Sequence, residues 1–112
     1  MDIAQRDSGD VTILDLTGKL TIGDDIDKLR DKVNSLLLEG NTKVVLNLGG
    51  VPYVDSAGLG ELVRTHSTAK KNGGQVVLLS VTERIKDLLS ITKLLSVFDS
   101  FDTEQEAIDS FS

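Results

Sequence analysis

The sequence predicts an α/β domain with a mostly parallel central sheet of four to five strands and helices packed against it. Strand-like and helix-like segments alternate along most of the chain, which is typical of parallel strands joined by crossover helices. Residues 43–48 and 75–81 are almost continuously apolar, as expected for strands covered on both faces. The 112 residues suffice for one core and are too few for two, so we expect a single domain over residues 1–112.

The chain is expected to begin with a β-hairpin. Residues 11–16 are rich in β-branched and aliphatic side chains and end just before Gly18, which predicts a strand with a mostly buried face. Residues 3–6 are the candidate partner strand, joined to it across the polar turn at residues 7–10.

An amphipathic helix is predicted next, over residues 24–38. Its apolar positions recur at helical spacing and form one stripe: Ile26, Leu29, Val33, Leu36 and Leu37. Asp24 or Asp25 is expected to cap it, because a carboxylate accepts hydrogen bonds from the free N–H groups at a helix start. Residues 39–41 end the helix, and residues 43–48 predict the following strand.

The second half of the chain continues the alternation. A second helix is predicted over residues 57–71, followed by a buried strand at 75–81. Thr82 is expected to cap a third helix, and residues 97–98 to form a short last strand or its approach. Residues 103–106 have the Thr-x-x-Glu pattern of a capping box and predict a short closing helix.

Composition excludes several classes of function. The chain has no cysteine, which removes disulfides, thiolate catalysis and cysteine-ligated metal sites. Its net charge of −6 disfavours binding to nucleic acid or anionic lipid. The charged first residues lack the apolar stretch of a secretory signal, and no apolar run approaches the roughly 20 residues that span a bilayer. We therefore expect a cytoplasmic protein with a protein partner or a small ligand.

The turn between the central strand and the second helix is the most informative segment. In open α/β sheets this edge is where ligands and partners usually bind. Ser56 stands where a helix N-cap would stand, and Gly58 and Gly60 occupy the first turn, where each glycine costs roughly 1 kcal/mol relative to alanine. Glycines at that cost indicate a backbone that another group must approach closely.

Two interpretations of Ser56 are compatible. In the first, its hydroxyl only caps the helix. In the second, the hydroxyl is accessible to a phosphoryl donor, because small residues flank it at Ala57 and Gly58. A phosphate would add about −1.5 to −2 charges; the helix dipole favours this charge and Asp55 opposes it. The added charge would then alter the surface that a partner contacts.

No catalytic, metal or cofactor site is predicted. The Asp-Ser-Ala-Gly turn is similar to the nucleophile elbow of serine hydrolases, but His66 lies ten residues downstream on the same helix, hence roughly 15 Å from Ser56. His66 is interpreted as a residue at the border of the buried helix face. Asp24, Asp25 and Asp27 are interpreted as helix-start charges rather than metal ligands.

Three stretches together resemble the STAS domain of bacterial anti-sigma factor antagonists. They are residues 51–60, residues 72–78 and the late Phe98-Asp99 before a short helix, and the similarity covers almost the whole chain. The resemblance implies that Ser56 is phosphorylated by a cognate anti-sigma factor, a serine kinase of the histidine-kinase-like ATPase fold. It further implies that the unphosphorylated protein binds this kinase and that a serine phosphatase resets the cycle.

The resemblance also implies a partner surface around the serine. This surface comprises Asp24, Asp25, Asp55, Ser56, Ala57, Gly58 and Gly60. Thr21 stands where the family often has an acidic residue, and Asp24 or Asp25 is expected to replace it. The alternative from another class is a constitutive scaffold or assembly module, in which Ser56 is only a cap and an exposed sheet edge or helix face drives association.

Overall fold

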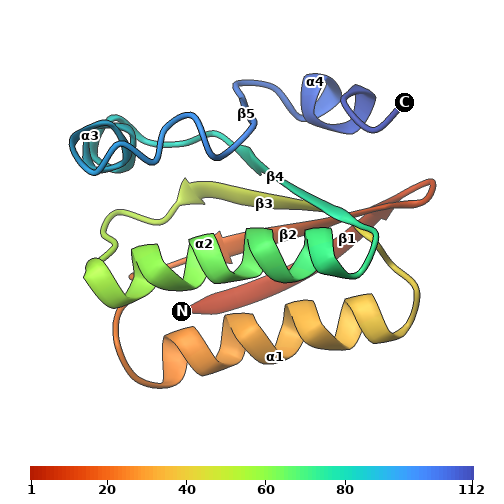
Figure 1. The fold of residues 1–112 in the computed structure, drawn as a ribbon, viewed down its shortest axis with the longest axis horizontal. Coiled ribbons are helices and arrows are strands. Elements are labelled where there is room, and N and C mark those ends of the chain that lie inside the picture. The colour runs from red at the N-terminus through yellow and green to blue at the C-terminus, as the bar shows by residue number, and fades with distance from the viewer.

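The computed structural model describes residues 1–112 as a five-stranded sheet with four helices. The elements in chain order are β1 (Asp2–Ser8), β2 (Val11–Thr17), α1 (Asp24–Leu38), β3 (Lys43–Gly50), α2 (Ser56–Lys71), β4 (Gln75–Leu79), α3 (Glu83–Ile91), β5 (Ser100–Phe101) and α4 (Glu104–Asp109). The strands lie in the order β1-β2-β3-β4-β5; β1 is antiparallel to β2 and the other neighbours are parallel (Figure 1). The predicted α/β class and mostly parallel sheet are confirmed.

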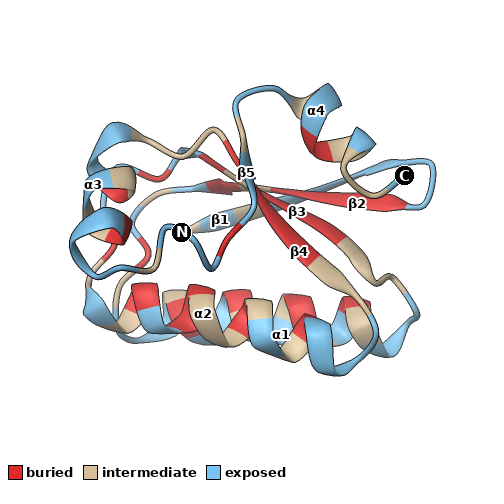
Figure 2. Cartoon of the chain, turned by 45° about the horizontal axis from the view of Figure 1, so that its top comes forward, coloured by how far each residue is buried: buried red, intermediate tan, exposed pale blue.

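The two faces of the sheet carry cores of different size. Helices α1 and α2 run side by side across one face and enclose a core of 20 buried residues (Figures 1 and 2). On the other face α4 packs over a smaller core of 6 buried residues. The alternation along β2 shows the division, because Leu14 points into the larger core and Ile13 into the smaller. Both faces of the central strands are therefore covered, as their continuous apolar sequence predicts.

The predicted hairpin and first helix are confirmed, but the predicted cap of α1 is wrong. Gly23 is the N-cap residue, with φ of 114°, and no side chain caps the helix. Asp24 and Asp25 lie inside the first turn, so they complement the helix dipole without capping. The Asp25 carboxylate instead accepts hydrogen bonds from the Met1 amino group at 2.9 Å and from Thr21 Oγ1 at 3.3 Å.

The last third of the chain departs from the prediction at the end of β4. β4 ends at Leu79 because Ser80, with φ of 55°, turns the chain out of the sheet. The short final strand is Ser100–Phe101, so residues 97–98 form its approach, the second of the two predicted alternatives, and Phe98 is buried in the larger core. The predicted caps are confirmed: Thr82 Oγ1 accepts from the Ile85 N–H at 3.4 Å, and Thr103 Oγ1 accepts from the Glu106 N–H at 3.2 Å. None of the four helices is both long and apolar enough to cross a membrane.

Candidate functional site

The connection from β3 to α2 is held rigidly at the carboxyl end of the sheet. Val51 and Val54 are buried and anchor it in the core. The backbone of Leu20, in the preceding β2–α1 connection, pairs with it: the Leu20 N–H donates to the Tyr53 carbonyl at 3.0 Å, and the Asp55 N–H donates to the Leu20 carbonyl at 3.3 Å. The two loops therefore form one surface.

Asp55 caps α2 and ties these loops together. Its Oδ1 accepts a hydrogen bond from the Gly58 N–H at 2.7 Å, and its Oδ2 accepts one from the Ile22 N–H at 2.9 Å. The hydrogen bond from Ile22, and then that from Gly58, stabilises the carboxylate and lowers the pKa of Asp55 below its usual value. Both oxygens of this side chain are thus engaged with backbone donors.

Ser56 is not the cap, and the first interpretation of this residue is therefore wrong. Because Asp55 occupies the N-cap position, Ser56 becomes the first residue of the helix. Its side chain is exposed and its hydroxyl makes no hydrogen bond within the chain. The structure thus presents a free hydroxyl at the start of a fixed helix, beside the half-buried Ala57.

The two glycines of the first turn differ in what surrounds them. Gly58 is buried, and a Cβ at this position would overlap the Leu20 carbonyl oxygen and lie 2.9 Å from Val54 Cγ1. The close approach predicted at Gly58 is therefore made by the protein's own backbone. Gly60 is exposed, and a Cβ there would meet no atom within 4 Å.

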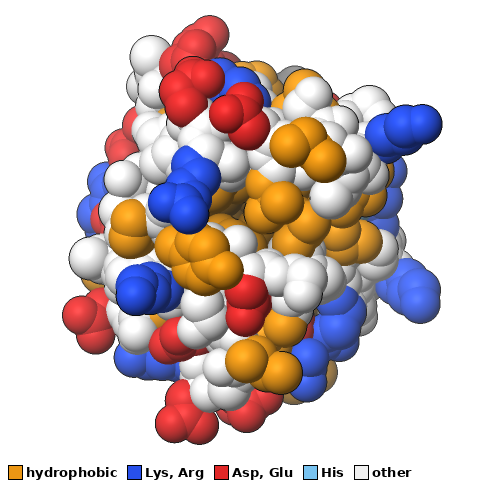
Figure 3. Space-filling model, turned by 90° about the vertical axis from the view of Figure 1, so that its left-hand side faces the viewer, with side chains coloured by type: hydrophobic (Ala, Val, Ile, Leu, Met, Phe, Trp, Pro, Cys, Tyr) orange, Lys and Arg blue, Asp and Glu red, His pale blue; other side chains and the backbone are white.

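A groove runs beside Ser56, between the start of α2 and the length of α3. It encloses about 400 Å³, and its walls include Tyr53, Ser56, Leu59, Arg84, Leu88 and Ile91. Tyr53 is 37% exposed and Ile91 is 79% exposed, so apolar surface at the rim faces solvent. Figure 3 looks onto this end of the molecule and shows apolar side chains gathered around a hollow with charged side chains at its border. This combination is typical of a protein-binding surface.

A second cavity of about 410 Å³ lies between the starts of α1 and α2. At its wall the buried Glu61 carboxylate accepts hydrogen bonds from Arg30 Nε at 2.8 Å and from Arg64 Nε at 3.0 Å. This cluster was not predicted from the sequence. The sequence does contain an indication of it: Glu61 stands next to Leu62 on the apolar face of a helix, where burying an unpaired carboxylate is unfavourable.

The remaining residues of interest are placed apart from Ser56. Asp24 is exposed on α1, and Asp25 is committed to Met1 and Thr21. His66 is half-buried farther along α2, its ring edge-on to Phe98 with centroids 5.4 Å apart. No group of three or more His, Asp or Glu side chains is arranged to hold a metal ion.

Comparison with known proteins assigns the fold to a family. The STAS domain family matches residues 2–107. The chain belongs to the STAS domain family. Among its curated relatives, the anti-sigma-B factor antagonist of Bacillus subtilis is 38% identical over 71 residues, a segment that covers 63% of this chain and 64% of the relative. The TM1081 homologue of Thermotoga neapolitana is 34% identical over 76 residues, which cover 68% of this chain and 67% of the relative.

Solved structures agree with this assignment over almost the full chain. TM1081 of Thermotoga maritima superposes with a TM-score of 0.88 at 28% identity, covering 96% of this chain and 92% of that protein. The phosphorylated form of the Bacillus cell fate determinant SpoIIAA has a TM-score of 0.75 at 19% identity, covering 99% and 100% of the two chains. At that identity SpoIIAA shows a shared fold alone.

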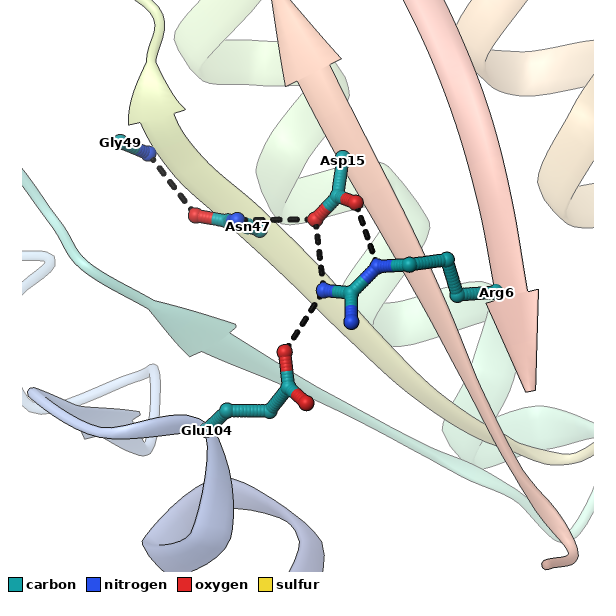
Figure 4. Close-up of polar contacts among 5 residues, drawn as sticks. All are labelled: Arg6, Asp15, Asn47, Gly49 and Glu104. Carbon is teal, nitrogen blue, oxygen red and sulfur yellow. Dashed lines mark hydrogen bonds and ion pairs between the residues drawn. The ribbon is translucent and has the colours of Figure 1, made fainter. Parts of the chain in front are cut away.

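This STAS domain has a further polar cluster on the sheet face that carries α4 (Figure 4). Arg6 Nε donates to Asp15 Oδ2 at 2.6 Å, and its Nη2 donates to Glu104 Oε1 at 2.6 Å. Asn47 Nδ2 donates to Asp15 Oδ1 at 2.8 Å, and the Asn47 Oδ1 accepts from the Gly49 N–H at 3.1 Å. The bond from Arg6 lowers the pKa of Asp15. The cluster connects three strands to α4, which gives it a structural role.

Proposed function

We propose that this STAS domain is an anti-sigma factor antagonist whose binding is switched by phosphorylation of Ser56. In this proposal the unphosphorylated protein binds an anti-sigma factor serine kinase of the histidine-kinase-like ATPase fold, releases it when phosphorylated, and is reset by a serine phosphatase. The observation that carries it is the exposed Ser56 hydroxyl, free of any capping bond, at the wall of a partly apolar groove. The names of the relatives support the class of partner.

The chain acts as the substrate of the transfer and not as the enzyme. The Ser56 oxygen forms a new bond to the γ-phosphorus of ATP, the bond from that phosphorus to ADP breaks, and the hydroxyl proton passes to the kinase or to solvent. The only histidine, His66, contacts Phe98 and is no base for Ser56. The kinase and ATP therefore supply the chemistry, in the cytoplasm where a sigma factor acts.

The phosphate would break partner binding through charge and desolvation. It would add about −1.5 to −2 charges beside Asp55 and Asp87, which line the same groove. A partner that covers Tyr53 and Ile91 would have to desolvate this charge, which is unfavourable in an apolar interface. In the proposed partner surface, Ala57, Gly58 and Gly60 follow Ser56 at the start of α2, whereas Asp24 lies in the first turn of α1.

The test is a binding titration of the candidate kinase against Ser56→Ala, Ser56→Asp and Ser67→Asp. Ser67 is an exposed serine on the same helix and controls for added charge. We expect Ser56→Ala and Ser67→Asp to bind like the wild type and Ser56→Asp to bind at least about tenfold more weakly, since like-charge contacts cost several kcal/mol. Mass spectrometry after incubation with kinase and ATP should find phosphate on Ser56. Equal affinities of the two Ser56 variants would contradict the switch.

A constitutive assembly module is the second candidate, favoured by the open edge of β1. This seven-residue edge strand is exposed at every residue except Ile3, and such edges can pair with another chain. Light scattering separates the candidates, because a protein that stays monomeric on concentration has no assembly function of this kind.

A further inference from the structure

We propose that Arg84 binds the phosphate on Ser56 within the same chain and thereby closes the groove between α2 and α3. The inference rests on the proposed function and deepens it, because it specifies what the phosphate does inside this protein.

Arg84 differs from the other arginines in having no acidic partner. The chain has four arginines, and the other three are paired: Arg6 with Asp15 and Glu104, and both Arg30 and Arg64 with Glu61. The Arg84 guanidinium instead lies over the Tyr53 ring, 5.2 Å from its centroid. It makes no hydrogen bond or ion pair within the chain, so its donors remain available for an anion.

The position of Arg84 on its helix is unfavourable without an anion nearby. Arg84 lies in the first turn of α3, directly after the cap Thr82 and Glu83. A cation at a helix N-terminus opposes the helix dipole, and this position normally favours an acidic side chain. A residue that breaks a local rule in this way points to a role beyond folding.

Ser56 is within the same groove as this free guanidinium. The two residues contribute to the wall of one cavity of about 400 Å³, Ser56 from α2 and Arg84 from α3. Asp55 forms no ion pair with Arg84; its two oxygens accept from the Gly58 and Ile22 N–H groups. Asp87 also lines the groove and forms no ion pair with Arg84.

A phosphate is a stronger partner for Arg84 than the ring it now covers. Phosphate carries about two charges and offers oxygens that match the paired donors of a guanidinium, whereas the exposed ring offers only a weak cation–π contact. Arg84 would therefore leave Tyr53 and connect the start of α3 to the start of α2. The bridge would cross the groove and obstruct it from within, in addition to the charge that the phosphate itself presents.

The test uses the full chain with phosphoserine incorporated at position 56 during synthesis, so that no kinase or partner is needed. Tyr53 is the only tyrosine and the chain has no tryptophan, so ultraviolet emission reports on Tyr53 alone. We expect phosphoserine to shift the emission of the wild type to that of unphosphorylated Arg84→Ala, in which the ring has no guanidinium above it. We expect no change when phosphoserine is added to Arg84→Ala.

Phosphorus NMR gives the second readout. The second ionisation of free phosphoserine lies near pH 6, and an exposed charge pair should lower it by about half a pH unit. Arg84→Ala should remove this shift, and Lys86→Ala, which removes a charge from the same helix outside the groove, should retain it. Two results together would overturn the inference. The phosphoserine would titrate at the same pH in the wild type and in Arg84→Ala, and phosphoserine would leave the Tyr53 emission of the wild type unchanged. Such a failure would leave the kinase-binding result for Ser56→Asp intact, so the two proposals can fail separately.

Discussion

Replacing Gly58 by alanine is the sharpest test of the geometry around Ser56. On helix propensity alone the change would stabilise α2 by about 1 kcal/mol. The structure predicts the opposite, because the new Cβ would overlap the Leu20 carbonyl oxygen and crowd Val54 Cγ1 at 2.9 Å. Forcing a methyl group into such a site costs about 1–3 kcal/mol. Displacing the Leu20 carbonyl also weakens its hydrogen bond from the Asp55 N–H, worth about 1 kcal/mol.

The net expectation for Gly58→Ala is a loss of about 1–3 kcal/mol in the free energy of unfolding. For a chain of this length that corresponds to a melting temperature lower by roughly 4–12 °C. Gly60→Ala is the matched control, since it lies on the same helix turn with open space around it and should gain about 0.5–1 kcal/mol. Urea titration followed by circular dichroism measures both. A Gly58→Ala protein as stable as the wild type would refute the proposed contact between the two loops.

Three further predictions concern charged and polar side chains. Glu61→Gln should lower the free energy of unfolding by about 1.5–3 kcal/mol in urea titrations, because a buried carboxylate that accepts from Arg30 and Arg64 becomes a neutral amide. An unchanged urea midpoint would show that the cluster does not stabilise the fold. In thermal melts, Asp55→Ala should lower the melting temperature because α2 loses its cap, whereas Ser56→Ala should change the free energy of unfolding by less than about 0.5 kcal/mol. Equal losses of stability in the two variants would mean that Ser56 shares the capping role. Hydrogen bonds lower the folded-state pKa of Asp55, so its contribution to stability is present above the unfolded-state value near pH 4 and is lost as the pH falls further. Urea midpoints measured from pH 6 to pH 3 should decline, and less steeply in Asp55→Asn.

Most of the fold could be predicted because it depends on local patterns. Apolar spacing locates α1 at the same bounds that the structure shows, and the Thr-x-x-Glu pattern locates the cap of α4. The strand ends were less predictable. Val81 extends the apolar pattern of β4 past Ser80, but the backbone leaves the sheet at Ser80, where the chain must turn toward α3. Sequence pattern carries no information about that change of direction.

The location of the site could be predicted from the sequence, but the role of each residue within it could not. Ser56 and Asp55 are both good capping residues, and their sequence does not decide which one caps; the contact of Asp55 with Ile22 from another loop does. Gly58 and Gly60 are likewise equivalent in sequence, and only the approach of Leu20 separates them. Each of these assignments depends on residues more than thirty positions away in the chain.

The division of roles between Asp55 and Ser56 has a consequence for regulation. A serine that capped α2 would lose its bond on phosphorylation, so each cycle of modification would also change the stability of the helix. Here Asp55 holds the helix start and the β2–α1 loop through backbone donors that a phosphate on Ser56 does not need. Under the proposed switch, the surface charge would then change while the fold stays constant, and the signal would pass to the partner and to the groove beside Arg84 without local unfolding of the helix start.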